Sequence, residues 1–327
     1  MFEVLQGGLE TTVQDYPGRL GYWNIGIPPS GPFDNLAFRL GNLLVGNSEG
    51  EAGLEITIMG PRLKFLKETV IAVTGADLSP MLNNNPIPMW KTVRVKEGDI
   101  LSFGLCRSGC RAYLTIAGGI DVPPFFGSKS TYVQGGIGGF EGRKLMKGDI
   151  VKTGKPKLPL NKLEERSVKP DVIPKYPTEW ELRVILGPQD DYLEDDFLVD
   201  MYVLGKYAWE VSPLFDRVGV RLEGPPHKWK PPEKRPPSGA HPSNINLVYC
   251  GMGIINVTGE VPVVCGVDGI SLTGYTSVAT LISADMWKLG QVKAGDKIRF
   301  KAVTLSEAKN AREELEKKIT QDNIITS

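Results

Sequence analysis

The sequence has few of the side chains from which metal sites and thiol or imidazole catalysts are built. It contains 4 cysteines and 2 histidines in 327 residues. Cys106 and Cys110 form a C-x3-C pair, which differs from the C-x-x-C spacing of zinc and redox sites. His227 and His241 lie in Pro-rich surroundings without a neighbouring nucleophile. The sequence therefore predicts no metal site and no Ser/His/Asp or Cys/His catalytic centre.

The C-x3-C pair leaves two interpretations open. Cys106 and Cys110 flank Arg107-Ser108-Gly109, a short loop that is typical of a hairpin. The two cysteines could oppose each other across the strands and form a disulfide, with buried free thiols as the alternative.

Net charge and long apolar runs are also lacking. Lys plus Arg and Asp plus Glu number 38 each, so no net positive field gathers nucleic acid or anionic lipid over a whole face. The longest apolar stretches fall far short of the roughly 20 residues of a membrane span. The first residues, Met1-Phe2-Glu3-Val4, lack the basic and apolar regions of a signal peptide. We expect a soluble, cytoplasmic protein that binds neither nucleic acid nor membrane.

Glycine and proline are abundant and separate short β-rich runs. The 38 Gly and 25 Pro punctuate segments such as 297–303, in which apolar and polar residues alternate. This pattern favours barrels or sandwiches over helical bundles. Three segments have helical patterns instead: one that Asp34 caps, one from about Asp190 to Met201, and one that begins with the capping box Thr304-Leu305-Ser306-Glu307. The predicted fold class is mainly β with a few helices.

The length of the chain predicts two domains. Residues 155–178 are rich in Pro and Lys and are predicted to be an extended, solvated linker. The predicted units are an N-terminal β domain over residues 1–154, a C-terminal β domain over residues 179–303, and a C-terminal helix and tail over residues 304–327. Both halves also contain a Gly-Asp turn before a strand, which favours a duplicated β unit with the site between the copies. A second Pro/Lys-rich stretch, 225–242, is predicted to be a long loop, either a plain excursion or a lid over a cleft.

Two glycine-rich polar stretches carry the candidate site residues. The first covers residues 8–19 and 28–34, where polar side chains stand beside glycines that let the backbone approach a ligand. The alternative is a capped turn leading into a helix, which Asp34 alone would explain. The second covers residues 118–143 and combines hydroxyl side chains, a lysine, a glycine-rich loop and an arginine, which could hold a carboxylate or phosphate. Neither stretch has Walker or G-x-G-x-x-G spacing, so no nucleotide site is predicted from a motif.

These stretches resemble the biotin-dependent carboxyltransferase/allophanate hydrolase subunit 2 family, which includes the C subunit of 5-oxoprolinase and the antagonist of the sporulation kinase inhibitor. The resemblance covers nearly the whole chain. It rests on Thr11-Thr12-Val13-Gln14-Asp15, Gly18-Arg19, Ser30-Gly31, Asp34, Leu44-Val45-Gly46-Asn47, Leu54-Glu55, Gly119-Ile120-Asp121-Val122-Pro123, Gly127-Ser128-Lys129-Ser130-Thr131 and Asp216-Arg217-Val218-Gly219. It implies two cyclophilin-like β-barrel domains and a partner similar to the family's subunit 1 or B-type subunit, with a third, A-type subunit in a 5-oxoprolinase complex.

The resemblance implies a subunit of an ATP-dependent 5-oxoprolinase, a hydrolase that opens 5-oxoproline to glutamate and is inactive without its partners. ATP would be bound here or by a partner subunit. An unactivated amide is a poor electrophile, so phosphorylation of its oxygen and fixed donors for the developing charge would assist ring opening. The candidate catalytic residues are Asp15 and Asp34. The candidate contacts for a small anionic amide are Gln14, Arg19, Ser30, Gly31, Lys129, Ser130, Thr131, Arg143, Asp216, Arg217 and Tyr275.

Two other functions fit the same resemblance. One is the carboxyltransferase half of a biotin-dependent urea or amide carboxylase. The sequence lacks the Ala-Met-Lys-Met motif of a biotin carrier, so biotin would arrive on a separate protein. The other is a regulatory protein that acts by binding a subunit-1-like partner.

Overall fold

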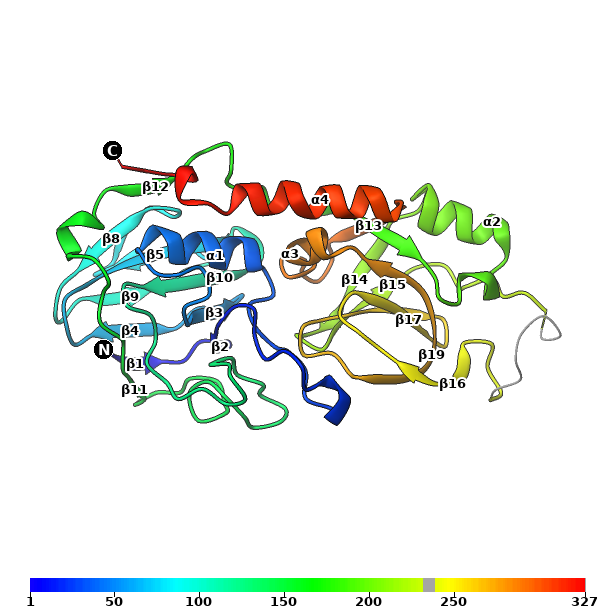
Figure 1. Ribbon diagram of the computed structural model, residues 1–327, viewed down its shortest axis with the longest axis horizontal. Coiled ribbons are helices and arrows are strands. Elements are labelled where there is room, and N and C mark those ends of the chain that lie inside the picture. The colour runs from blue at the N-terminus through cyan, green and yellow to red at the C-terminus, as the bar shows by residue number, and fades with distance from the viewer. Residues whose placement is uncertain (232–238, 327) are drawn as a thin grey trace. The chain divides into compact units, whose positions relative to one another are not determined.

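The computed structural model describes residues 1–231 and 239–326, and the chain divides into two compact units (Figure 1). Unit 1 comprises Met1–Gly21, Pro29–Tyr176 and Leu315–Ser327, and unit 2 comprises Tyr22–Pro28 and Pro177–Glu314. Strands hold 37% and helices 16% of the residues. The predicted fold class, mainly β with a few helices, is therefore confirmed.

Unit 1 contains two antiparallel sheets that share one core. The six-stranded sheet has the order β11-β1-β4-β9-β6-β7 and the five-stranded sheet the order β2-β3-β10-β5-β8. Their strands are β1 (Phe2–Gln6), β2 (Glu10–Gln14), β3 (Gly53–Thr57), β4 (Arg62–Phe65), β5 (Thr69–Asp77), β6 (Met81–Leu82), β7 (Asn85–Pro86), β8 (Thr92–Val95), β9 (Ile100–Ser102), β10 (Ser108–Ile116) and β11 (Ile150–Val151).

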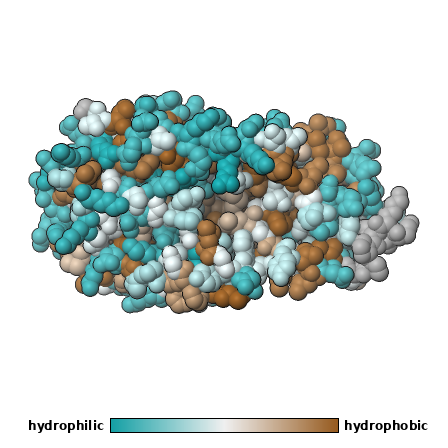
Figure 2. All heavy atoms as spheres, in the orientation of Figure 1, coloured by the Kyte–Doolittle hydropathy of each residue, from teal (hydrophilic) through white to brown (hydrophobic). Residues whose placement is uncertain are grey.

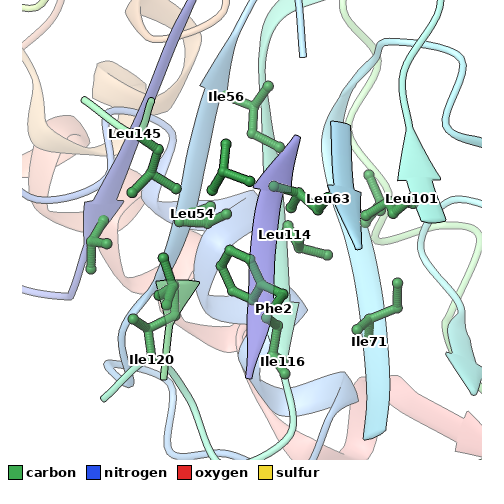
Figure 3. Close-up of a cluster of buried hydrophobic side chains, with 14 of the residues drawn as sticks. Phe2, Leu54, Ile56, Leu63, Ile71, Leu101, Leu114, Ile116, Ile120 and Leu145 are labelled. Carbon is green, nitrogen blue, oxygen red and sulfur yellow. The ribbon is translucent and has the colours of Figure 1, made fainter. Parts of the chain in front are cut away.

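Apolar side chains from both sheets of unit 1 pack against one another. Phe2, Leu63 and Leu101 come from the six-stranded sheet, and Leu54 and Leu114 from the five-stranded sheet (Figure 3). All five are fully buried. Figure 2 shows that hydrophilic side chains cover much of one face of the molecule. Buried and more exposed residues alternate along β1 and β4 of the six-stranded sheet, whereas β3, β5 and β10 of the five-stranded sheet are buried along nearly their whole length.

The predicted helix after Asp34 is α1 (Asn35–Leu44), and the Asp34 carboxylate accepts a hydrogen bond from the Ala37 N–H at 2.9 Å. The helix packs closely on β5 and β10, where Thr74 and Thr115 donate their hydroxyl protons to helix carbonyls, each at 2.8 Å. A Cβ at Gly41 would lie 2.9 Å from the Thr74 hydroxyl oxygen, so glycine permits this approach.

Unit 2 contains a closed barrel. Its strands follow the order β13-β20-β14-β15-β18-β17-β19, and β19 pairs back onto β13, while β16 adds to β19 outside the barrel. The parallel pair β13–β20 and the antiparallel pair β13–β19 close the ring. The strands are β13 (Glu179–Leu186), β14 (Trp209–Phe215), β15 (Gly219–Glu223), β16 (Asn244–Tyr249), β17 (Ile254–Thr258), β18 (Val261–Cys265), β19 (Leu272–Leu281) and β20 (Lys297–Ala302), and a short helix α3 (Met286–Leu289) precedes β20.

The prediction of one continuous helix from about Asp190 to Met201 is wrong. The segment forms a 3-10 turn (Asp190–Tyr192), the short helix α2 (Asp195–Leu198) and a π-helical turn (Val199–Val203). The interruption lies at Leu193, which is fully buried and has extended backbone that forms a β-bridge with Trp229. Tertiary pairing at this residue overrides the local helical pattern.

Residues 155–178, which the sequence predicts to be a solvated linker, contain a short strand and three buried apolar side chains. Arg166–Val168 forms β12, which pairs with β21 (Ile324–Thr326), and the side chains of Leu163, Val168 and Val172 are buried. The division between the units falls after Tyr176. The few apolar residues among the prolines and lysines are enough to dock most of this segment on unit 1.

The C-terminal region 304–327 is not separate from the two units. The helix α4 (Leu305–Lys318) begins with the predicted capping box, because the Glu307 carboxylate accepts from the Thr304 N–H at 2.7 Å and the Thr304 hydroxyl accepts from the Glu307 N–H at 3.2 Å. Residues from Leu315 onward belong to unit 1.

Three further predictions concern a loop, the cysteines and a membrane span. In the predicted loop 225–242, residues 232–238 lie outside the described part of the chain, and His227 on one flank is buried. All four cysteines are free thiols, Cys106 and Cys110 included. None of the helices within residues 1–231 and 239–326 has the length and apolar composition of a membrane span.

Candidate functional site

The site is built where a long loop of unit 1 runs beside β2. Between β10 and β11, the N–H groups of Thr131 and Leu145 donate to the carbonyls of Val13 and Thr11 at 2.9 and 2.8 Å. The Thr131 hydroxyl also donates to the Val13 carbonyl at 2.9 Å. The loop therefore covers the outer edge of β2 and holds its own hydroxyl-rich turn, 128–131, against the end of that strand.

Gln14 ties this loop to the segment before α1. Its Nε2 donates to the Thr131 carbonyl at 3.2 Å, and its Oε1 accepts from the Gly31 N–H at 3.1 Å. Gly31 has a φ of 85°, which favours glycine. Gln14 and Thr131 are buried, so these predicted contact residues shape the site and are not open to a ligand.

The carboxylate of Asp15 is held by three donors from that loop. Oδ1 accepts from the hydroxyls of Ser128 and Ser130 at 2.5 and 2.6 Å, and Oδ2 accepts from the Lys129 N–H at 2.8 Å. A carboxylate has about four lone-pair positions. Asp15 is half-buried, so its carboxylate is fixed in direction and keeps capacity for one further donor.

Arg19 supports the loop from beneath. Its side chain is 1% exposed, and its Nε and Nη2 donate to the carbonyls of Phe125 and Ser130 at 3.0 and 2.7 Å. A Cβ at Gly138 would lie 2.4 Å from Nη2, and one at Gly139 would lie 1.8 Å from the Thr131 hydroxyl. Both glycines have a positive φ. The glycine-rich loop therefore allows close packing over Arg19 and Thr131, which is a structural role.

A pocket of about 430 Å³ opens beside Asp15 and is built entirely from unit 1. It is lined by residues 15–17 and 48–52 together with residues 124, 127 and 129. This volume lies within the range of small-molecule sites, about 300–1,000 Å³. Of the residues predicted as site residues, Asp15 and Lys129 line it.

The pocket carries more negative than positive charge. Among its lining residues, Asp15, Glu49 and Glu51 are acidic and Lys129 is basic. The Lys129 ammonium lies 3.1 Å from a Glu51 carboxylate oxygen and donates to the Ile120 carbonyl at 3.2 Å. Glu49 pairs with Arg39 at 2.8 Å, so the lining carboxylate that is left to meet a hydrogen-bond donor of a ligand is Asp15.

Glu51 and Glu49 are positioned by residues behind the pocket. A Cβ at Gly119 would lie 2.2 Å from the Glu51 Cγ, so this glycine makes room for the Glu51 side chain. Glu49 pairs with Arg39 at 2.8 Å, and the Arg39 guanidinium stacks 4.5 Å above the Tyr16 ring. Burial lowers the pKa of Arg39, but hydrogen bonds to Glu316 and Glu49 outweigh burial and raise this pKa above its usual range.

Asp34 and Ser30 do not line the pocket. Besides capping α1, the Asp34 carboxylate accepts from the Tyr176 hydroxyl at 3.0 Å, and Asp34 is fully buried. Burial and the charge of Asp34 raise the pKa of Tyr176 well above its usual value. The structure thus gives Asp34 the helix-capping role that the sequence left as the alternative. Ser30 is 3% exposed with a φ of 58°, in the turn before α1.

The remaining predicted contacts lie elsewhere. Arg143 is half-buried in unit 1 and pairs with Asp149 at 2.7 Å, outside the pocket lining. In unit 2, the Asp216 carboxylate accepts from the Val218 N–H at 2.7 Å in an exposed turn, and buried Arg217 pairs with Asp268 at 2.8 Å. Tyr275 is 38% exposed on β19.

Nine lining residues were not among the predicted site residues, namely residues 16, 17, 48–52, 124 and 127. Glu49 and Glu51 lie in the turn after α1, and Tyr16 and Ser48 complete that wall. The signal for the acidic pair was the run Ser48-Glu49-Gly50-Glu51, two carboxylates around a glycine directly after the Gly46-Asn47 helix end. Within the described residues, no group of three or more His, Cys, Asp or Glu side chains is placed to hold a metal ion.

The chain is similar to a known family over most of its length. Residues 25–302 match the family described as "Carboxyltransferase domain, subdomain A and B". A putative urea carboxylase of Emericella nidulans is 43% identical over 323 residues, which are 97% of this chain and 25% of that protein. The C subunit of 5-oxoprolinase from Escherichia coli is 33% identical over 321 residues, which are 98% of this chain and 97% of that protein.

A solved structure has the same fold. The crystal structure of the Kluyveromyces lactis urea carboxylase superposes with a TM-score of 0.90 at 39% identity, over 99% of this chain and 30% of that one. The chain therefore spans about a quarter to a third of the length of the two urea carboxylases and nearly all of the length of the 5-oxoprolinase subunit.

Proposed function

Because the chain belongs to the family of carboxyltransferase domains with subdomains A and B, we propose that it is the component that transfers a carboxyl group to the nitrogen of a small neutral amide such as urea. The observation that carries this proposal is the pocket in which Asp15 is aimed by three donors and Glu51 lies 3.1 Å from the Lys129 ammonium. A neutral amide donates N–H groups to carboxylates, and the Asp15 carboxylate has an acceptor position left for one of them.

The higher identity to the urea carboxylase than to the 5-oxoprolinase subunit supports the same substrate class. The anionic amide predicted from the sequence fits less well, because its charge and the carboxyl group to be transferred would both need Lys129, the cation of the pocket lining. Carboxyl transfer to a neutral amide is therefore our first proposal, and the role of a 5-oxoprolinase subunit is the second.

In the proposed reaction the pocket residues orient the amide and hold charge. Asp15 accepts an amide N–H and fixes the direction of the nitrogen. The Lys129 ammonium stabilises negative charge that develops on oxygen, while Glu51 keeps Lys129 in place. A carboxylate of the pocket would take the proton that the amide nitrogen loses as its bond to the carboxyl carbon forms. The bond from that carbon to the carrier nitrogen would break at the same time, and the proton would pass to the carrier nitrogen that leaves.

Biotin would be the carrier of the carboxyl group, supplied to this site as carboxybiotin on a separate carrier protein. The pocket residues suit this ligand class, because Lys129 can contact carboxyl oxygens and Asp15 can accept from ureido N–H groups.

A reconstitution assay tests the proposal. The chain would be mixed with a biotin carboxylase, a biotinylated carrier protein, ATP and labelled bicarbonate, and transfer of label to urea or to 5-oxoproline would be measured. Urea-dependent transfer that requires this chain is the expected result. The proposal fails if label transfer does not depend on urea or on this chain.

A second candidate function is that of a 5-oxoprolinase subunit, which the near-complete match to the E. coli protein favours. In this case glutamate would be released from 5-oxoproline in the presence of ATP and of A-type and B-type partners, and omission of any partner would abolish release. Activity with neither substrate in any mixture would favour the regulatory binding protein instead.

A further inference from the structure

Two buried cysteines of unit 2 lie in contact. Cys250 follows β16 and Cys265 ends β18, and their sulfur atoms are 3.4 Å apart. Their exposed fractions are 7% and 4%. Since a disulfide bond is about 2.05 Å long, the sulfurs must approach by about 1.4 Å to form one.

The backbone around both cysteines is already fixed. The Cys250 N–H donates to the Ser271 carbonyl, and the Cys265 carbonyl accepts from the Gly253 N–H, each at 2.8 Å. These bonds hold the two residues close together in the folded barrel, so a covalent link requires no unfolding.

A buried amide is directed at the two sulfurs. Nδ2 of Asn256, in β17, lies 3.3 Å from each sulfur. Its Oδ1 accepts from the Ser277 hydroxyl at 2.9 Å, which fixes the orientation of the amide group. Asn256 is 4% exposed. An N–H donor stabilises a thiolate more strongly than a neutral thiol, so this arrangement favours one negative charge on the pair.

The contact between the two thiols also favours one negative charge on the pair. The hydrogen bond from Cys265 lowers the pKa of Cys250, against the opposing effect of burial, and the Asn256 amide adds to the lowering. The pKa of Cys265 is raised because its proton is held against the Cys250 sulfur. One proton is thus shared by the two sulfurs, and we assign the attack to Cys250 because it is the more exposed of the two, at 7% against 4%.

We propose that Cys250 and Cys265 form a reversible redox modification site that hydroperoxides oxidise to a disulfide. The Cys250 thiolate attacks the peroxide, a sulfur–oxygen bond forms, the O–O bond breaks, and the leaving hydroxide or alkoxide takes up a proton. Cys265 then attacks the sulfenic sulfur, so that the disulfide forms, the sulfur–oxygen bond breaks, and water leaves with the Cys265 proton. The two thiols lose two electrons, and the peroxide is reduced to water and water or alcohol.

The disulfide would join the end of an outer strand to the barrel. β16 pairs with β19 outside the ring, whereas β18 is within it. Cys250 and Cys265 are 15 residues apart. A covalent link between them reduces the number of conformations of the unfolded chain and is expected to raise the melting temperature of unit 2.

Peptide mapping of the native full-length chain tests the proposal. The protein is treated with a small excess of hydrogen peroxide, quenched with N-ethylmaleimide and digested, and the peptides are identified by mass spectrometry. The expected product is a Cys250–Cys265 cross-linked peptide that dithiothreitol cleaves. Cys106 and Cys110 of unit 1 are internal controls and are expected to stay alkylated as free thiols.

Two variants separate this site from a pair of inert buried thiols. Cys265→Ser is expected to stop the reaction at a Cys250 sulfenic acid that dimedone traps. Asn256→Asp replaces the amide donor by a carboxylate of the same shape and is expected to slow cross-linking about tenfold, with far-ultraviolet circular dichroism as the check of folding. Complete alkylation of Cys250 and Cys265 after peroxide treatment of the wild-type chain would overturn the proposal. These readouts do not depend on carboxyl transfer.

Discussion

Two buried arginines show how differently the two units use positive charge. Arg19 of unit 1 is 1% exposed and donates to the main-chain carbonyls of Phe125 and Ser130. Arg217 of unit 2 is 3% exposed and pairs with the carboxylate of Asp268 at 2.8 Å. Arg19 thereby shapes the loop that aims Asp15, whereas Arg217 belongs to an ion pair inside its own unit.

The comparison extends to the surrounding charges. In unit 1, Asp15, Glu51 and Lys129 meet at a pocket of about 430 Å³. In unit 2, Asp216 closes a turn, and Arg217 and Asp268 bind each other. We therefore expect charge changes at the pocket of unit 1 to affect activity, and charge changes at the Arg217–Asp268 pair of unit 2 to affect stability.

The largest effect is expected for Arg217→Met. Removing one partner leaves the Asp268 charge buried and unpaired, which costs about 3–5 kcal/mol in the free energy of unfolding. Denaturant titration measures the loss. Lys301→Met is the matched control, because its pair with Glu181 is 3.9 Å long and exposed, and it should change stability by less than about 1 kcal/mol. Equal losses in the two variants would contradict the contrast between buried and exposed pairs.

A pH effect of similar size is expected from His227. Burial lowers the pKa of His227 to about 4, against the opposing effect of Glu260. The unfolded chain binds a proton near the ordinary value of about 6.5, before the folded chain does, so unfolding takes up protons in this window. The contribution of His227 to the free energy of unfolding is fully present above that value. It decreases as the pH falls towards 4, and about 3 kcal/mol is then lost.

The His227→Phe variant isolates that contribution. His227 stacks on Trp209 with a centroid distance of 5.4 Å, and phenylalanine keeps an aromatic ring there without a titrating group. Denaturant unfolding between pH 7 and pH 4 should give a shallower loss of stability in the variant than in the wild type. Parallel curves for the two proteins would contradict the assignment to His227.

A smaller effect is expected for Glu51→Gln in the pocket of unit 1. Loss of the carboxylate weakens the hold on the Lys129 ammonium and is expected to reduce kcat/KM for carboxyl transfer about tenfold, or about 1.4 kcal/mol. Lys129→Met and the double variant complete the cycle. If Glu51 acts through Lys129, the double variant loses no more than Lys129→Met alone. Additive losses would show separate roles.

The smallest effect is expected for Thr304→Ala, at the start of α4. This change removes the hydroxyl that accepts from the Glu307 N–H at 3.2 Å and should lower the melting temperature by about 2–4 °C. Ser306→Ala in the same turn is the control. A larger drop for Ser306→Ala than for Thr304→Ala would show that the cap does not stabilise this helix.

The sequence predicted the elements whose signals are local. The Asp34 cap and the Thr304–Glu307 box both depend on residues three apart, and both helices begin where predicted. Residues 190–201 failed because Leu193 pairs with Trp229, a contact 36 residues away that no local pattern contains. In residues 155–178, composition reports the many solvated polar residues but not the three apolar side chains, Leu163, Val168 and Val172, that are buried.

The same distinction applies to the site. The Asp15 and Lys129 segments were identified as motifs, and the structure brings them together through hydrogen bonds across 114 residues. The motifs did not show which of their residues line the pocket and which only support it. Gln14, Arg19 and Thr131 belong to the motifs but are buried beneath the pocket loop. Glu49 and Glu51 were missed because a short acidic turn carries no local sign of its partners, which are Arg39 for Glu49 and Lys129 for Glu51.

The most direct test compares Asp15→Asn with Arg143→Met in urea-dependent carboxyl transfer. Asp15 lines the pocket, and Arg143 lies in the same unit outside its lining. The asparagine amide would present a donor to the donors of Ser128, Ser130 or Lys129, so we predict a loss of about 100-fold or more in kcat/KM for Asp15→Asn and a rate close to wild type for Arg143→Met. Wild-type activity in Asp15→Asn, with correct folding shown by its melting temperature, would contradict the account.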